Sequence, residues 1–149
     1  MKRILVMLAF FLGALVTISA TPRPHAKELI LEDGSMLVAF DANTGAIIRM
    51  ERKATGWMLE RRSELGVSFR MHVPLPDRRY NFVLGQKQRV KSAEQIAPNE
   101  IRLRWDDLMS ENGGMLPIAL TAIITLKDGA LTFNTSVDNR SNLTIESID

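Results

Sequence analysis

Short stretches in which apolar and polar residues alternate run along most of this chain, and this pattern restricts its fold more than any other feature. Residues 101–106 alternate between apolar and charged side chains, and residues 67–73 alternate in the same way. A period of two places successive side chains on opposite faces of a β-strand. Turn-forming segments at 33–34, 42–45 and 127–129 separate the stretches. The sequence therefore predicts an all-β fold, an antiparallel β-sandwich of about ten strands.

Two of the expected strands carry predictions about burial. Residues 116–126 are apolar on both faces, so we expect a central strand covered on both sides. In the next strand we expect Leu131, Phe133, Thr135 and Val137 to point into the core. Helical signals are limited to single turns, within residues 60–65 and 106–111. The expected strands span residues 28–32, 35–41, 46–51, 57–59, 67–73, 80–84, 88–96, 101–105, 116–126, 130–138 and 143–148.

The first twenty residues have the layout of a secretory signal peptide. Two basic residues precede an uncharged apolar run over 4–18, and small residues lead to a cleavage position after Ala20. The run is shorter than the roughly 20 residues of a spanning helix, which favours a cleaved signal over an anchor. We therefore expect 1–20 to be a signal peptide, 21–27 a flexible tail and 28–149 one β-domain. The protein is then exported, to a periplasm or the extracellular space.

The exported part of the chain is close to neutral and contains no cysteine. Of 19 Lys and Arg, Lys2 and Arg3 belong to the signal, which leaves 17 against 17 Asp and Glu. A nucleic-acid partner is disfavoured, because such proteins gather basic residues on one face. The absence of Cys excludes disulfides, thiolate catalysis and Cys-ligated zinc.

No local motif indicates a metal, a cofactor or a catalytic group. His25 and His72 are the only histidines, and their spacing does not match a metal site, so we interpret them as surface residues. A Gly-x-Ser-x-Gly nucleophile motif is absent. Asp106 and Asp107 are adjacent, and neighbours on a strand face opposite sides, which is poor geometry for an acid–base pair. We expect no cofactor and no metal.

Aromatic residues suggest a surface for sugar rings. Trp105 alternates with Ile101 and Leu103, which predicts a core position. Trp57 stands beside Met58 and Leu59, so the core interpretation competes with a binding role. In the stretch 77–81, the aromatic Tyr80 has arginine and asparagine neighbours, whose N–H groups can donate hydrogen bonds to vicinal hydroxyls of a sugar. The alternative interpretation is that Arg78 and Arg79 are ordinary solvated charges of a loop. The candidate carbohydrate-binding residues are Arg78, Arg79, Tyr80, Asn81 and Trp57.

Three N-glycosylation sequons fall close together near the end of the sequence, at Asn134, Asn139 and Asn142. Their use depends on the host, which the sequence does not identify. They carry no weight in a bacterium and mark surface positions in a eukaryotic secreted protein.

A set of diffuse motifs over about residues 28–149 resembles a known class of domain. Residues 40–50 form a strand, a turn ending in glycine and a second strand, and Thr55-Gly56 follows. Segments 131–133 and 137–142 are similar to a strand that ends in Asn-x-Ser, with Ile145 in the strand after it. Between the opening motif and the closing motif, the strand expected at 67–73 and the residues Asn81 and Gly85 also match the pattern of this class. Together they resemble the N-terminal β-supersandwich domains of the galactose-mutarotase-like class, which precede the catalytic domain of several glycoside hydrolases and polysaccharide lyases.

The resemblance implies an accessory, carbohydrate-binding module that packs against a downstream catalytic domain of glycoside hydrolase type. Mutarotases use a His and a Glu as acid and base, in contexts that His25, His72 and the glutamates here do not match. The resemblance therefore implies no catalysis by this chain alone. Two alternatives stay open: a non-catalytic sandwich for adhesion or cell-surface interaction, and a sugar epimerase-like protein.

The final residues, 143–149, read as a strand in progress, and domains of this class are larger than this one. We therefore expect the chain to be the N-terminal piece of a longer protein, with its β-domain truncated at the C-terminus. Neither the glycan nor its linkage follows from the sequence.

Overall fold

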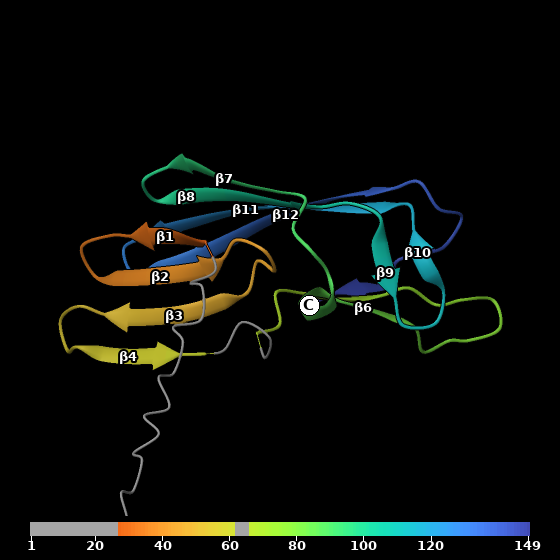
Figure 1. Ribbon diagram of the computed structural model, residues 1–149, viewed down its shortest axis with the longest axis horizontal. Coiled ribbons are helices and arrows are strands. Elements are labelled where there is room, and N and C mark those ends of the chain that lie inside the picture. The colour runs from red at the N-terminus through yellow and green to blue at the C-terminus, as the bar shows by residue number, and fades with distance from the viewer. Residues whose placement is uncertain (1–26, 62–65) are drawn as a thin grey trace, which may run out of the picture.

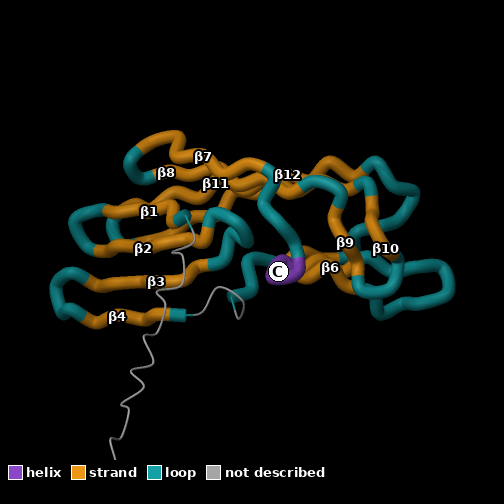
Figure 2. The backbone as a smooth tube through the Cα atoms, in the orientation of Figure 1, coloured by secondary structure: helices purple, strands orange, loops and turns teal. Residues whose placement is uncertain are grey.

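The computed structural model of the protein describes residues 27–61 and 66–149, and in these ranges the regular structure is antiparallel β-sheet (Figures 1 and 2). Thirteen strands form three sheets, and the same ranges contain no α-helix and one 3-10 helix, Gly85–Lys87. The prediction of an all-β antiparallel fold is confirmed. The expected signal peptide and nearly all of the expected tail lie outside the described residues.

Two four-stranded sheets and one five-stranded sheet make up the fold. The N-terminal sheet has the order β1-β2-β3-β4 and contains β1 (Glu28–Glu32), β2 (Met36–Asp41), β3 (Ile47–Arg52) and β4 (Trp57–Glu60). The long-strand sheet has the order β12-β11-β8-β7 and contains β7 (Ser92–Ala97), β8 (Glu100–Trp105), β11 (Ile118–Lys127) and β12 (Ala130–Asn139). The five-stranded sheet has the order β10-β9-β6-β5-β13 and contains β5 (Arg70–His72), β6 (Phe82–Leu84), β9 (Leu108–Ser110), β10 (Gly114–Leu116) and β13 (Ser147–Ile148).

All three sheets contribute to one hydrophobic core. In β1, Leu29 and Leu31 are buried while their neighbours are exposed, so the alternation in the sequence turns one face of the strand inward. β1 contacts β7, β8 and β11, so the N-terminal sheet lies against the long-strand sheet (Figure 1). Apolar residues of the five-stranded sheet, among them Met71 and Val83, belong to the same cluster. In β8, Ile101, Leu103 and Trp105 are buried, as their alternation predicts.

Asp33 connects the β1–β2 turn to the distant β11–β12 turn. Its carboxylate accepts hydrogen bonds from the backbone N–H groups of Ser35 and Met36, at 2.7 and 2.8 Å. The backbone N–H of Gly129 donates to the other carboxylate oxygen at 2.7 Å. These donors favour the ionised form, with Gly129 the largest contribution, and so hold the pKa of Asp33 below its ordinary value. One side chain thereby ties the N-terminal sheet to the long-strand sheet.

The prediction for β11 is correct for its position and wrong for its covering. The strand is central, paired with β8 on one side and β12 on the other. Its residues Leu120, Ile124 and Leu126 are buried, whereas Thr121 and Ile123 on the outer face are only half-buried. No second layer among the described residues covers that outer face, so a strand that is apolar on both sides has one covered side.

The prediction for β12 is wrong about burial. Phe133 is 52% exposed and Val137 is 37% exposed. The strand pairing explains the discrepancy: Leu131, Phe133, Thr135 and Val137 stand opposite the inward residues of β11. They therefore share the inward face, but β12 is the edge of its sheet. The described part of the N-terminal sheet leaves that face largely uncovered.

Two further expectations need correction. The helical turn expected within 106–111 is absent, because Leu108–Ser110 form β9, which pairs with β10 and β6. The strand expected at 67–73 is shorter, since only Arg70–His72 pair as β5 and Val67 is exposed. The helical turn expected within 60–65 falls mostly outside the described residues.

Candidate functional site

A tight turn between β5 and β6 carries most of the candidate sugar-binding residues. Leu75 N donates to the Arg78 carbonyl at 2.9 Å, and Arg78 N donates to the Leu75 carbonyl at 3.1 Å. Pro76 occupies the second position of this turn, where its fixed φ is favourable. The turn places Arg78, Arg79 and Tyr80 together on an exposed surface.

Asn81 lies inside the protein at the base of this turn. Its side-chain amide donates to the Val73 carbonyl at 2.8 Å, and its side-chain oxygen accepts the backbone N–H of Asn112 at 2.9 Å. The residue is fully buried. A buried amide with both ends paired stabilises its surroundings, because an unpaired polar group there would cost free energy. Asn81 thus supports the turn from below and does not face solvent with its three neighbours.

Three aromatic rings form a cluster above β5 and β6, here called the ring platform and consisting of His72, Tyr80 and Phe82. His72 and Phe82 are directly opposite in the strand register, and their ring centroids are 4.7 Å apart. The Tyr80 ring lies nearly parallel to the His72 ring, at 6.4 Å and 11°. The Arg70 guanidinium carbon lies 5.4 Å from the centroid of Phe82, within cation–π range. Tyr80 is 73% exposed, so the platform presents an aromatic surface to solvent.

Ion pairs and hydrogen bonds fix the positions of the arginines and of His72 at the ring platform. Arg79 donates to both carboxylate oxygens of Glu146, at 3.1 and 3.0 Å. The same carboxylate lies 3.2 Å from His72 Nδ1, and His72 Nε2 lies 2.8 Å from the Arg79 carbonyl oxygen. Arg78 donates to the side-chain oxygen of Asn112 at 2.8 Å. A guanidinium carries five N–H donors, so both arginines retain donors beyond these contacts.

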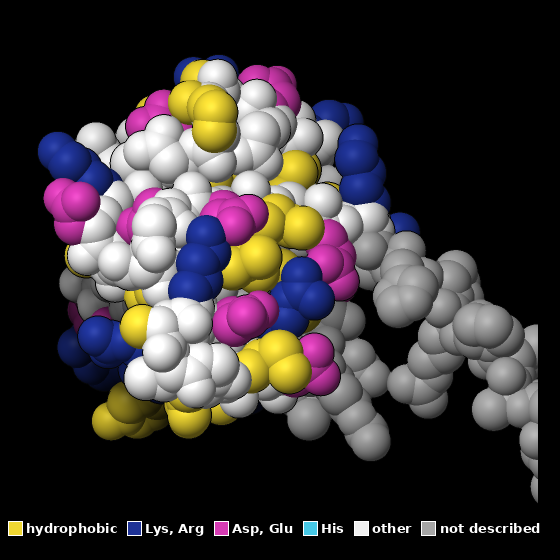
Figure 3. Space-filling model, turned by 90° about the vertical axis from the view of Figure 1, so that its left-hand side faces the viewer, with side chains coloured by type: hydrophobic (Ala, Val, Ile, Leu, Met, Phe, Trp, Pro, Cys, Tyr) yellow, Lys and Arg dark blue, Asp and Glu magenta, His cyan; other side chains and the backbone are white. Residues whose placement is uncertain are grey.

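Trp57 lies apart from the ring platform. It begins β4, the edge of the N-terminal sheet, whereas the β5–β6 turn belongs to the five-stranded sheet at the other end of the molecule (Figure 1). Trp57 is 57% exposed, and Met58 and Leu59 are also exposed, so the core interpretation of Trp57 was wrong. Figure 3 looks onto the end of the molecule that carries the β3–β4 turn, and hydrophobic side chains reach the surface at its lower edge, where β4 lies.

The sequence did not reveal three members of the site: His72, Phe82 and Glu146. Alternation placed His72 on the polar face of its strand, but stacking with Phe82 depends on the register of β5 and β6. Glu146 is 67 residues away from Arg79 and reaches it through the pairing of β13 with β5. A local pattern does not contain this information.

Comparisons with known proteins assign no family: no family matches the chain, and no curated protein matches it. Within residues 27–61 and 66–149, no group of three or more His, Asp or Glu side chains is placed to hold a metal ion. No helix in the described ranges is long and apolar enough to cross a membrane.

Proposed function

We propose that this chain is an exported, accessory β-sandwich module of supersandwich-like architecture that binds carbohydrate and belongs to an enzyme of glycoside hydrolase type. One observation carries the proposal: Tyr80 exposes 73% of its surface while its ring lies parallel to His72, beside two arginines. The packing of the N-terminal sheet against the long-strand sheet supports the sandwich architecture. The signal-like residues 1–20 support export.

The chemistry of the ring platform suits a sugar. The flat face of an aromatic ring packs on the apolar face of a pyranose, and Tyr80 offers such a face. Arg78 and Arg79 supply donors for hydroxyl groups, and the Glu146 carboxylate supplies acceptors. The bidentate Arg79–Glu146 pair fixes the guanidinium before binding, which reduces the entropy that a ligand must overcome.

The contact between His72 and Glu146 argues against the epimerase-like alternative. An acid and a base that act on one sugar must leave room for the substrate between them. Here His72 Nδ1 and the Glu146 carboxylate lie 3.2 Å apart and contact each other directly. We therefore assign these residues to the support of Arg79 and Tyr80, and the module itself to binding without catalysis.

The exposed apolar residues of β4 support the accessory part of the proposal. Trp57 and Leu59 share one face of this edge strand and Met58 lies on the opposite face, and all three are exposed. Exposed apolar side chains that gather on one face mark an interaction surface, so we assign the patch of Trp57 and Leu59 to contact with the proposed downstream catalytic domain. An exposed apolar surface on β4 fits the adhesion alternative equally well, so carbohydrate binding must be tested directly.

The test is affinity electrophoresis in gels that contain mixed-linkage β-glucan, xylan, galactomannan or galactan, followed by calorimetry with an oligosaccharide of the retarding polymer. We expect Tyr80→Ala and Arg79→Ala each to weaken binding by roughly 1–2 kcal/mol, the scale of a stacking face or a charge-assisted hydrogen bond. That corresponds to a loss of about 5- to 30-fold in affinity.

Matched variants give the controls. Arg52→Ala removes an exposed arginine of β3, and Trp57→Ala removes the exposed aromatic residue of β4. Both should bind the polysaccharide as the wild type does. Carbohydrate binding at the ring platform is refuted if no polysaccharide retards the wild type, or if the Tyr80→Ala variant is retarded as strongly as the wild type. Either result would favour the adhesion alternative.

A further inference from the structure

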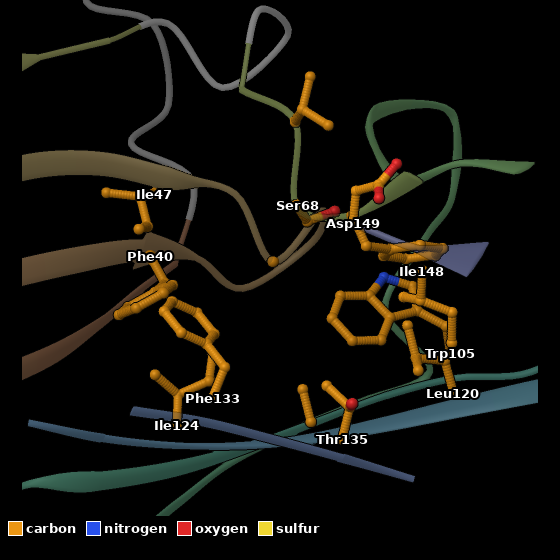
Figure 4. Close-up of a pocket in the computed structure, with 14 residues that line it drawn as sticks. Phe40, Ile47, Ser68, Trp105, Leu120, Ile124, Phe133, Thr135, Ile148 and Asp149 are labelled. Atoms are coloured by element: carbon orange, nitrogen blue, oxygen red, sulfur yellow. The ribbon is translucent and has the colours of Figure 1, made fainter. Parts of the chain in front are cut away.

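A cavity of about 340 Å³ lies between the N-terminal sheet and the long-strand sheet; we call it the Trp105 cavity (Figure 4). Its size falls in the range of roughly 300–1,000 Å³ that small-molecule sites occupy. Most of its walls are apolar, and β2, β3, β8, β11 and β12 all contribute to them. The apolar residues that form its main walls are Phe40, Ile47, Leu120, Ala122, Ile124 and Phe133.

Two residues that line the cavity each carry a buried polar atom without a hydrogen-bond partner among the described residues. These atoms are Trp105 Nε1 and Ser68 Oγ. Trp105 is only 2% exposed, so its indole N–H is shielded from bulk water. Figure 4 shows the indole nitrogen on the side of the ring that faces Ser68 and Asp149. Buried donors are almost always paired, so two orphaned groups in one cavity indicate a missing acceptor.

The surrounding structure fixes both groups in place. Phe69 packs edge-on against the Trp105 ring, with centroids 5.1 Å apart. A Cβ atom at Gly45 would collide with the Trp105 ring, and one at Gly85 would collide with Ser68 Oγ. Glycine at these two positions leaves only enough space for the indole and the hydroxyl as they stand. The indole N–H therefore keeps its direction without a ligand, and the Ser68 oxygen keeps its position while its hydrogen can rotate. A fixed donor of this kind is the preorganisation that binding sites use.

We propose that the Trp105 cavity binds a small uncharged molecule with an aromatic or alicyclic body and one carbonyl oxygen. An indole N–H is a donor only, and a serine hydroxyl can also donate. A carbonyl oxygen only accepts hydrogen bonds, so it is the partner that the indole donor lacks, and its second lone pair is available to the Ser68 hydroxyl. This inference does not depend on the proposed carbohydrate site, which lies on the ring platform.

The charges at the cavity favour a neutral ligand. Asp149 is among the residues that line the cavity, and its carboxylate would repel an anion there. Arg70 already donates twice to that carboxylate, at 3.1 and 2.8 Å, so the negative charge is compensated and a buried cation would gain little. Phe133 and Thr135 form the wall on the β12 side, where Phe133 is half exposed and provides the route of entry.

The test uses 2-acetonaphthone, which carries the carbonyl, and 2-isopropenylnaphthalene, a hydrocarbon of nearly the same shape in which a CH2 group replaces the carbonyl oxygen. The chain has two tryptophans, so a ¹H–¹⁵N spectrum shows two indole signals, and Trp57→Phe assigns them. We expect the ketone to move the Trp105 indole signal saturably and downfield, as a new hydrogen bond requires. The Trp57 signal should stay in place. The ketone should bind at least about fivefold more tightly than the hydrocarbon.

Two variants complete the test. Ser68→Ala should weaken the ketone and leave the hydrocarbon unchanged, and Thr135→Phe should fill the cavity and abolish binding of both probes. Circular dichroism and thermal melting verify that each variant folds. An unmoved Trp105 signal, or equal affinity for both probes in the wild type, would overturn the proposal. So would a Trp105 signal that shifts with protein concentration alone, because a second copy of the chain would then cover the cavity.

Discussion

At the scale of single residues, Asp33 makes the connection with the widest reach. Its carboxylate accepts one hydrogen bond from Gly129, 96 residues further along the chain, and two from its own turn. The bond from Gly129 requires the folded protein, and all three bonds are stronger with the ionised carboxylate than with the protonated acid. The lowered pKa of Asp33 therefore contributes to stability.

The sign of the resulting pH dependence follows from the direction of the shift. A carboxyl group with a lower pKa in the folded state stabilises the fold above the unfolded pKa and loses this contribution as the pH falls through the folded pKa. We expect Asp33→Asn to destabilise the protein at neutral pH, and the gap to the wild type to narrow below the ordinary value of 3.8. Urea unfolding at pH 7 and at pH 3 measures the difference in unfolding free energy between the wild type and the variant at each pH. Asp128→Asn, in the exposed β11–β12 turn, is the control, and a gap of constant size at the two pH values would contradict the assignment.

Gly45 offers a second test at this scale. Its φ of 75° is left-handed, and a Cβ atom there would collide with the Trp105 ring. Gly56 has a similar φ of 65° but open space around its Cβ position. We expect Gly56→Ala to cost about 1–2 kcal/mol for the conformation alone. Gly45→Ala should cost a further 1–3 kcal/mol or so for overpacking. Equal losses in chemical denaturation would show that the Trp105 ring moves aside.

At the scale of the elements, the paired strands β11 and β12 differ in how well they are covered. Leu120 of β11 and Val137 of β12 are opposite in the register, yet Leu120 is buried and Val137 is partly exposed. We expect Leu120→Ala to destabilise by about 2–5 kcal/mol. Val137→Ala should cost less than about 1 kcal/mol, as substitutions near the surface do. Chemical denaturation of both variants measures the two losses in unfolding free energy. A large loss at Val137 would mean that a further layer covers β12 in solution.

The same two strands show how far the sequence predicts this fold. Alternation is local, and it assigned the inward face of both β8 and β12 correctly. Burial is not local, since it depends on which strand lies opposite, so Phe133 was expected in the core and is half exposed. The short strand β9 has only three residues and depends on its neighbours β6 and β10, so its local sequence predicts a helical turn and not a strand.

In the candidate site, too, local features were predictable from the sequence and features that depend on strand pairing were not. Arg78, Arg79 and Tyr80 are consecutive in a turn with a proline signal, so the sequence was sufficient to place them together. Asn81 belonged to the same polar stretch, but its position under the turn depends on contacts with Val73 and Asn112. The stacking of His72 and the reach of Glu146 depend on strand register, which the local sequence leaves open.

At the scale of the whole molecule, one series of contacts joins the ring platform to the Trp105 cavity. Asp149 lines the cavity and accepts two hydrogen bonds from Arg70. The Arg70 guanidinium lies over the ring of Phe82, a member of the platform. Both proposed sites therefore share the Arg70–Asp149 ion pair, although one is a polar surface and the other an apolar interior.

The two ion pairs made by Glu146 and Asp149 also have a consequence for the order of synthesis. Their arginine partners, Arg79 and Arg70, and the three rings of the platform all lie between residues 70 and 82. A ribosome delivers the N-terminal side first, so these residues leave it long before their acidic partners. The ring platform is therefore complete only after residues 146–149 have been translated and β13 has paired with β5.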